Sequence, residues 1–170
     1  MGTVKPRNPS NVLDILTSQH SEVDKLLATL EKQGKDRTVF LELANKLAAH
    51  AACEEKVFYP AVMTGKTSDM LHESVEEHLE IKRLLADMIE QDLDEDEFAA
   101  KLNVLKENVS HHAHEEEEDK LFPMLRKAMS EDELAAIGSE YLAMFEALLP
   151  TDPYKHVPSE TAEAAPLPRT

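Results

Sequence analysis

Cysteine, glycine and long apolar runs are all scarce in this sequence. It contains one cysteine and four glycines among 170 residues. A single cysteine excludes an internal disulfide, so we expect a reducing, cytoplasmic location. No apolar run approaches the ~18 residues that a membrane span requires. The stretch MGTVKPRNPSNV lacks the apolar segment of a secretion signal. The sequence also shows no glycine-rich phosphate loop and no nucleophilic triad.

Basic residues are few relative to acidic ones. The chain has 18 Lys and Arg against 34 Asp and Glu, which gives a formal net charge of −16. Nucleic acids and anionic membranes would be repelled by this charge, so we expect neither as a partner. The same charge is compatible with binding cations, although most of these carboxylates are expected to lie on a solvated surface.

The chain length suits a single domain with terminal extensions. Residues 1–9 are predicted to form an N-terminal arm, and residues 10–130 a helical bundle. Residues 131–148 are predicted to form an extra helix. The last segment, 149–170, contains five of the nine prolines and is predicted to be a tail that is either flexible or draped over the surface.

Between the arm and the tail the apolar residues recur at helical spacing, and no stretch alternates as a strand would. Helices are therefore predicted over 10–32, 37–63, 67–91, 95–129 and 131–148. Ser10 or Asn11 would cap the first helix, and Gly34 follows its end. Short connections between long helices predict an all-α fold, an up-down antiparallel four-helix bundle with a short fifth C-terminal helix.

One histidine of each long helix falls on the apolar face of that helix. His20 lies between Leu16 and Val23 at steps of four and three residues. His50, His78 and His112 occupy equivalent places on the other three long helices. Two glutamates follow on the same faces. The candidate ligands are His20, His50, Glu54, His78, His112 and Glu117, with Glu116 as the alternate for the last.

Such a set of buried polar groups is difficult to satisfy by hydrogen bonds among its members alone. A buried carboxylate is costly unless it is paired or bound to a metal. Imidazole and carboxylate ligands suit iron, manganese or zinc. Six protein ligands exceed what one tetrahedral zinc takes. We therefore expect two metal ions bridged by the glutamates, with iron ahead of manganese or zinc.

Two similar phrases, HAACEEKVFYP and HHAHEEEEDKLFP, support an internal duplication. Each contains a histidine, adjacent glutamates and a proline, Pro60 or Pro123. The second phrase is one residue longer between its core histidine and the proline. Glu116 keeps a four-residue step from His112, whereas Glu117 lies on the apolar face that continues downstream. A π-bulge would absorb the extra residue, which favours Glu117.

These motifs lead to a family resemblance over roughly residues 10–130. LTSQHSEVDKLL, HAACEEKVFYP, SVEEHLEIKRLL and HHAHEEEEDKLFP resemble, in order, the metal-bearing segments of the hemerythrin-like, HHE cation-binding domain proteins. The resemblance implies a four-helix bundle with a non-haem di-iron centre bridged by two carboxylates. It departs from the oxygen carriers at Ser74, where they have a fifth histidine. A water, Glu77 or Glu73 would then complete the ligand set.

Three functions follow from this reading. The first is a non-haem di-iron protein that binds O2, nitric oxide or peroxide, or that senses redox or iron status; a weak oxidase or peroxidase activity is compatible with it. The second is a ferritin-like oxidase or iron store, disfavoured because Glu-x-x-His is absent. The third is a metal-free helical adaptor. Phe58 and Tyr59 are predicted to be core residues, and Cys53 an inert packing residue.

Overall fold

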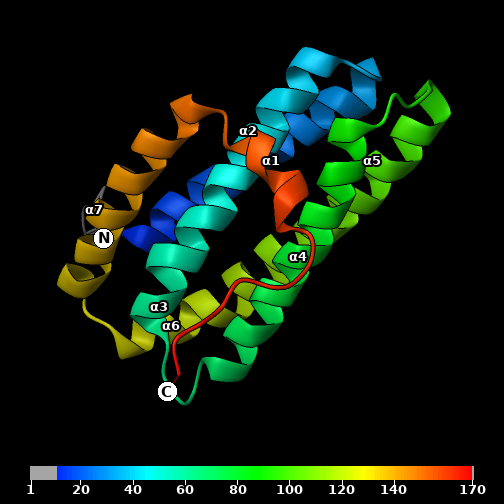
Figure 1. Cartoon of the computed structure of the whole chain (residues 1–170). Helices are drawn as coiled ribbons and strands as arrows, with labels where there is room; N and C mark the ends of the chain where they lie inside the picture. Colours follow the sequence, from blue (N-terminus) through cyan, green and yellow to red (C-terminus); the bar gives the residue numbers. More distant parts are fainter. Residues whose placement is uncertain (1–10, 170) are drawn as a thin grey trace, which may run out of the picture.

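The computed structural model describes residues 11–169 of the chain (Figure 1). The predicted arm, residues 1–9, and Ser10 as a helix cap lie outside these residues. All regular structure in the described range is helical, and no strand occurs there. No helix of residues 11–169 is both long and apolar enough to cross a membrane. The all-α prediction is confirmed.

The first two long helices begin at side-chain caps. α1 (Val12–Gln33) starts at Asn11, whose side chain accepts a hydrogen bond from the Leu13 backbone N–H at 2.9 Å. It ends at Gly34, whose φ of 81° a residue with a Cβ rarely adopts. The second long helix begins at Asp36 and comprises α2 (Arg37–Cys53), the π-helical turn η1 (Glu54–Phe58) and α3 (Tyr59–Val62).

The third and fourth long helices complete an antiparallel bundle. α4 spans Ser68–Glu90, and the fourth helix comprises α5 (Glu95–Ser110), the π-helix η2 (His111–Leu121) and α6 (Phe122–Ala128). Asp94 and Glu97 form a capping box at the start of α5. Figure 1 shows the four long helices side by side and joined by short connections. The predicted up-down four-helix bundle is confirmed.

Two of the long helices contain π-helical turns. The irregularity predicted for the helix around residues 95–129 is present, as an eleven-residue stretch rather than a single bulge. The η1 turn in the helix over 37–62 was not expected. In both, a backbone N–H bonds the carbonyl five residues earlier, Tyr59 to Glu54 and Phe122 to Glu117. Residues five apart are therefore stacked about one turn apart, which changes which side chains face the core.

The bundle core consists of two apolar clusters with a polar layer between them. Val23, Leu47 and Ile81 belong to one cluster, and Leu16 and Val75 belong to the other. Each long helix passes from one cluster to the other at its buried histidine. The polar layer therefore lies deep in the bundle and is sealed above and below by apolar side chains.

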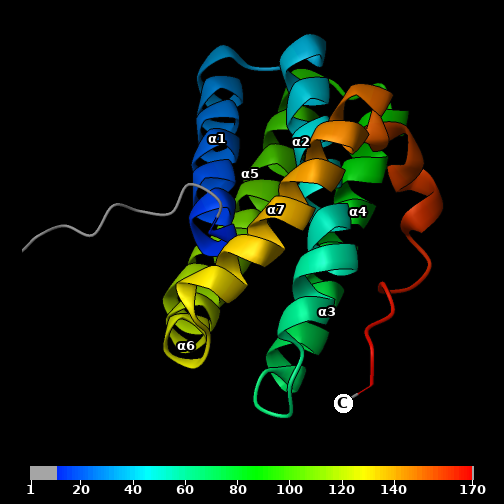
Figure 2. The same ribbon diagram turned by 90° about the vertical axis from the view of Figure 1, so that its left-hand side faces the viewer.

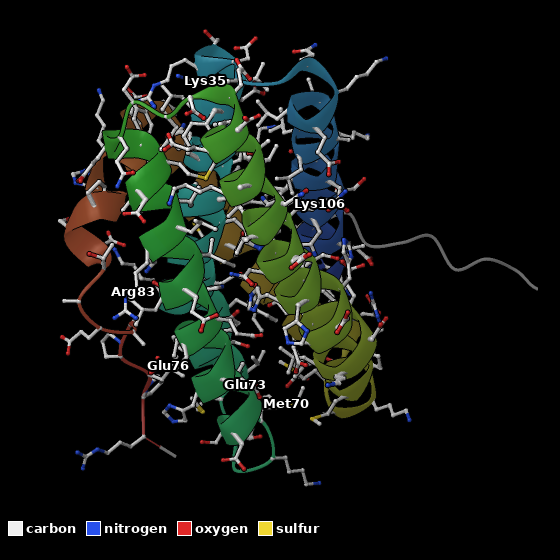
Figure 3. All side chains as sticks on the ribbon, turned by 90° about the vertical axis from the view of Figure 1, so that its right-hand side faces the viewer. Lys35, Met70, Glu73, Glu76, Arg83 and Lys106 are labelled. Atoms are coloured by element: carbon white, nitrogen blue, oxygen red, sulfur yellow. The ribbon has the colours of Figure 1, made fainter. Side chains whose placement is uncertain are left out.

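Two C-terminal segments pack on the outside of the bundle. α7 (Glu131–Leu148) begins at a capping box of Ser130 and Glu133 and crosses α1 and α2 (Figure 2). The following residues form η3 (Leu149–Thr151) and η4 (Pro153–Glu160). We expected a flexible or surface-draped tail there, and the structure agrees with the second alternative. The η4 segment lies on α2 and α4, with Val157 2% exposed, and Arg83 of α4 donates to the Thr161 carbonyl at 3.0 Å (Figure 3).

Candidate metal centre

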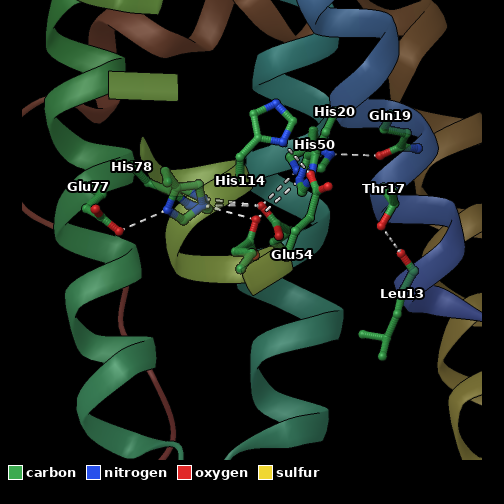
Figure 4. A network of polar contacts seen from close by, with 12 residues as sticks. Leu13, Thr17, Gln19, His20, His50, Glu54, Glu77, His78 and His114 are labelled. Carbon is green, nitrogen blue, oxygen red and sulfur yellow. Dashed lines mark hydrogen bonds and ion pairs between the residues drawn. The ribbon is translucent and has the colours of Figure 1, made fainter. Parts of the chain in front are cut away.

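Four histidines, one from each long helix, converge in the polar layer (Figure 4). Each ring directs Nδ1 away from the centre, toward an oxygen of a neighbouring side chain. The Nδ1 partners are Glu118 for His20 at 2.7 Å, Gln19 for His50 at 2.8 Å, Glu55 for His78 at 2.9 Å and Glu77 for His112 at 3.0 Å. Ionised carboxylates and amide oxygens only accept, so each Nδ1 carries a proton. The Nε2 atoms point inward.

Two glutamates occupy the centre of this layer. Glu54 and Glu117 are both fully buried. Glu54 Oε1 lies 3.0 Å from His50 Nε2 and 3.3 Å from His78 Nε2. Glu117 Oε1 lies 3.3 Å from His20 Nε2 and 3.4 Å from His112 Nε2. These six residues, His20, His50, Glu54, His78, His112 and Glu117, are called the histidine–glutamate cluster below.

Several atoms at the heart of the cluster have no hydrogen-bond partner among the described residues. They are His20 Nε2, both carboxylate oxygens of Glu54, and Glu117 Oε1. Buried polar atoms without partners are rare, because each costs roughly 1–3 kcal/mol and more when charged. The unpartnered atoms are all lone-pair donors of the kind that metals bind. The residues therefore fit a metal better than they fit one another.

The cluster divides into two groups that share one carboxylate. His20, His50, Glu54 and Glu117 form one, and Glu54, His78 and His112 form the other, with their ligand atoms within 4.8 Å of one another in each. We call these the first and second groups. Glu54 belongs to both, and Glu117 Oε1 lies between His20 of the first and His112 of the second. The layer thus offers places for two cations rather than one.

The electrostatics of the cluster also indicate a missing positive charge. Burial and the nearby charge of Glu54 raise the pKa of the Glu117 carboxyl to about 7. Burial would lower the pKa of His20, but the neighbouring carboxylates of Glu117 and Glu118 raise it to about 9. When no metal is bound, protonation of His20 at Nε2 would therefore supply a positive charge beside the Glu117 carboxylate, where a metal cation would otherwise lie.

The alternate candidate Glu116 lies outside the cluster, and so does the nearby His114. Glu116 pairs with Lys120 at 2.9 Å on the bundle surface, and it also lies 3.6 Å from the half-exposed ring of His111. His114 pairs with Asp24 at 2.8 Å and has a side chain 36% exposed. The π-helical winding of η2 brings His112 and Glu117, five residues apart, to the same face. All six residues of the cluster were primary candidates from the sequence, and the structure brings them together.

Other polar groups of the layer were not anticipated from the sequence. Gln19 and Tyr141 both contact His50 Nδ1, and the Tyr141 hydroxyl donates to Gln19 Oε1 at 2.6 Å. Tyr141 comes from α7, so only the docking of that helix creates this contact. Gln19 precedes His20 in the sequence, but no periodic signal marks it. Glu77, considered as a possible ligand, instead accepts from His112 Nδ1 on the outer side.

Tyr59 was predicted to be a core residue, and its hydroxyl also contacts the histidine–glutamate cluster. Its ring is fully buried and belongs to the apolar cluster below the polar layer. Its hydroxyl, however, reaches the second group, 3.3 Å from His78 Nε2 and 3.2 Å from His112 Nε2. The hydroxyl donates to Glu117 Oε2 at 3.2 Å. The unexpected η1 turn is the reason that the sequence pattern did not reveal this contact.

A small apolar cavity adjoins the histidines on the opposite side of the polar layer. Its volume is about 30 Å³, and its walls include Val23, Leu47, Ile81 and Val109 with the rings of the four clustered histidines. A cavity must exceed roughly 10–15 Å³ to hold one water. The space therefore admits a molecule of two or three atoms and excludes larger ones.

Comparisons with known proteins agree with the family resemblance drawn from the sequence motifs. A curated DNA nickase from Nostoc sp. strain PCC 7120 is 27% identical over 136 residues, which is 78% of this chain and 38% of the relative. The chain thus spans well under half the length of that relative. No solved structure matches significantly. Residues 11–125 match the family model described as the Hemerythrin HHE cation binding domain, and the chain belongs to that family.

Proposed function

We propose that the histidine–glutamate cluster holds two iron ions and that the pair binds a small ligand such as O2, nitric oxide or peroxide. His20 and His50 would bind one ion, and His78 and His112 the other. Glu54 and Glu117 would bridge the two. The single observation that carries this proposal is the common orientation of the histidines, Nε2 inward and Nδ1 held outward by an oxygen.

This orientation is the one that metal-binding histidines adopt. A ligating imidazole usually donates its other N–H to a carboxylate or carbonyl, which sets the tautomer and the ring direction. All four clustered rings have such a partner. When both rings are neutral with Nδ1 protonated, as in a metal-binding imidazole, His78 Nε2 and His112 Nε2 present lone pairs to each other at 3.0 Å. Two lone pairs at that distance repel, and a cation beside them removes the repulsion.

Iron is favoured by the donor set. Four imidazole nitrogens and two carboxylates suit iron, manganese or zinc, and the set contains no soft ligand. Cys53 is the one cysteine of the chain, and it belongs to neither group of the cluster, so the donor set contains no thiolate. Two bridging carboxylates suit a pair of metal ions that each bind more than four ligands. Iron binds that many, whereas structural zinc binds four.

When bound, the metal pair would supply one-electron chemistry and an open coordination position. The chain supplies the surroundings. The residues around the cavity are largely apolar, and its volume of about 30 Å³ limits the ligand to a few atoms. Glu118, Gln19, Glu55 and Glu77 hold the imidazole rings in place. The protein thus presents a sealed, pre-organised centre suited to a diatomic ligand or a peroxide.

The alternatives lack comparable support. A ferritin-like oxidase carries Glu-x-x-His on two helices, but Leu47, Val75 and Val109 stand three residues before the clustered histidines. An adaptor would leave the carboxylates of the cluster buried without partners. The nicking activity named for the Nostoc relative belongs to a protein of which this chain matches 38%. A net charge of −16 disfavours DNA binding, so we do not extend that activity to this chain.

The test is ligand binding by the iron-loaded protein and by a variant with a reduced cavity. Nitric oxide is titrated into the reduced protein, and azide into the oxidised protein, with absorbance as the readout. Val109→Ile adds a methylene beside the cavity and is expected to weaken binding at least tenfold with iron content unchanged. Val75→Ile is the matched control, since Val75 also lies three residues before a clustered histidine but belongs to the other apolar cluster.

Binding of nitric oxide or azide that is strong in the wild type, retained in Val75→Ile and weakened in Val109→Ile supports the proposal. An iron-loaded protein that binds neither ligand contradicts the ligand-binding function. A protein that takes up manganese or zinc but no iron contradicts the choice of metal.

A further inference from the structure

We propose that the hydroxyl of Tyr59 is itself a metal ligand in the second group and takes the coordination position that a fifth histidine would otherwise fill. This inference rests on the proposed function, because it requires metal in the cluster. It goes beyond that function by assigning a ligand outside the histidine and glutamate set, and with it an anionic oxygen on only one of the two ions.

The distances around the Tyr59 hydroxyl are those between ligands that share one metal. Two donors at right angles, each about 2.1 Å from a metal, lie about 3 Å apart. Tyr59 Oη lies 3.3 Å from His78 Nε2, 3.2 Å from His112 Nε2 and 3.2 Å from Glu117 Oε2. The two Nε2 atoms are 3.0 Å apart, and Glu54 Oε1 lies 3.3 Å from His78 Nε2.

Tyr59 cannot satisfy all of these neighbours by hydrogen bonding. The hydroxyl has one proton and donates it to one acceptor. When both imidazoles are neutral, as metal-binding imidazoles are, three acceptors surround it: His78 Nε2, His112 Nε2 and Glu117 Oε2. At least two contacts of about 3.2–3.3 Å therefore join lone pairs to lone pairs. A cation bound among these atoms would accept a lone pair from each of them, so each contact would join two ligands of the same metal ion.

The backbone places Tyr59 here for a specific reason. The η1 turn closes with a bond from the Tyr59 N–H to the Glu54 carbonyl, five residues back. Glu54 and Tyr59 therefore follow each other on the core face about one turn apart. In a regular α-helix the same five-residue step would turn Tyr59 well away from that face. The ring also stacks on His78, with centroids 5.6 Å apart and planes inclined by 29°.

The other residues considered for this coordination position do not compete with Tyr59. Ser74, which stands where the resemblance places a fifth histidine, is buried and has a short side chain. Glu73 is exposed on the outer face of α4 (Figure 3), and Glu77 is engaged with His112 Nδ1 and His111. Of the residues considered to complete this ligand set, neither glutamate faces the cluster, whereas the Tyr59 hydroxyl does.

Coordination by Tyr59 requires a balanced proton transfer. The O–H bond breaks as Oη binds the ion, and the proton leaves to solvent, one per chain. Burial and the charges of Glu117 and Glu54 raise the pKa of the free phenol well above its usual value, so the phenolate forms only with the metal. A bound cation ionises such ligands outright. A phenolate is a hard anionic oxygen donor, and tyrosine ligates iron in other proteins.

The test uses the full chain loaded with iron and oxidised, with iron content measured alongside the spectra. A phenolate bound to ferric iron gives a visible charge-transfer band, and excitation in that band enhances tyrosinate ring vibrations in the Raman spectrum. We expect both signals in the wild type and in Tyr141→Phe, and neither in Tyr59→Phe. Tyr141→Phe is the matched control, because Tyr141 is also buried and contacts a clustered histidine, but at its outer nitrogen.

Each result decides between the two proposals. Two irons per chain without a tyrosinate signal would overturn the Tyr59 ligand and leave the di-iron proposal intact. A signal that persists in Tyr59→Phe would also overturn it. Absence of iron from the wild type would instead contradict the proposed function, and the Tyr59 ligand with it. Tyr59→Phe removes one oxygen and keeps the ring stacked on His78, so we expect the variant to fold and to retain at least one iron.

Discussion

Replacing Glu54 by Gln should separate the stability of the bundle from the stability contributed by its metal. Glu54 is the carboxylate common to both groups of the cluster, and it is fully buried. Glutamine keeps the shape of the side chain but removes its charge and one of its two acceptor oxygens. A bridge between two cations is lost, so both ions should bind far more weakly.

The expected size of the effect follows from binding linkage. A metal present at a thousand times its Kd stabilises the folded state by about 4 kcal/mol. For a chain of this length each kcal/mol corresponds to a shift in Tm of roughly 2–4 °C. Chelation should therefore lower the Tm of the wild type by about 8–16 °C. The Glu54→Gln variant should show little or no shift on chelation.

The metal-free forms should differ much less. Removing one of two neighbouring buried carboxylates relieves repulsion with Glu117, while the facing histidines His50 and His78 lose a charged partner. Replacing buried charges by neutral groups is often neutral or stabilising. We expect the free energies of unfolding of the two metal-free proteins to differ by no more than about 2 kcal/mol, because these two effects oppose each other.

The assay is thermal denaturation followed by circular dichroism, with and without iron, and with iron content measured on the same samples. Glu116→Gln is the control, because Glu116 neighbours Glu117 in sequence but pairs with Lys120 on the surface. It should keep the metal-dependent shift. A Glu54→Gln variant that retains two irons and the full shift would refute the reasoning, as would a Glu116→Gln variant that loses them.

Three further predictions concern the surroundings of the cluster. Gln19→Leu removes an acceptor from His50 Nδ1 and should weaken iron binding about 10–100-fold in competition with a chelator; an unchanged affinity would show that this contact does not orient the ring. Ser130→Ala removes the cap of α7 and should lower the free energy of unfolding in denaturant by about 1 kcal/mol, with the denaturant dependence m unchanged. A free energy of unfolding equal to that of the wild type would contradict a contribution of the cap to stability. Cys53 is buried with its pKa raised to about 12, so iodoacetamide at pH 8 should modify it only after denaturant is added; rapid labelling of the native protein would contradict its burial.

Much of the bundle could be predicted from the sequence because its signals are local and repeated. Apolar residues at helical spacing placed all four long helices, and the interruption of each stripe by one histidine located the polar layer. The choice of Glu117 over Glu116 rested on the apolar residues that follow it, Leu121, Met124 and Ala128. Leu121 is buried below the cluster in the structure, whereas Met124 is half-buried and Ala128 is exposed.

The remaining features depend on winding and docking, which periodicity does not report. A regular helix was assumed after Glu54, so Tyr59 was assigned to the apolar core, and the η1 turn places its hydroxyl in the second group instead. Tyr141 reaches His50 only because α7 lies across α1 and α2. The sequence left open whether the proline-rich segment is flexible or lies on the surface of the bundle, and the burial of Val157 shows the second arrangement. Each case required a long-range contact to be known first.

The most direct test of the account is the iron content of the wild-type chain. The protein is loaded with ferrous iron under anaerobic conditions, desalted and analysed by mass spectrometry for metal and by amino-acid analysis for protein. The two groups of the cluster predict two irons per chain, both lost on treatment with a strong chelator. A chain that retains no iron after desalting would contradict the central claim, and the four inward-facing histidines would then have to be explained as packing.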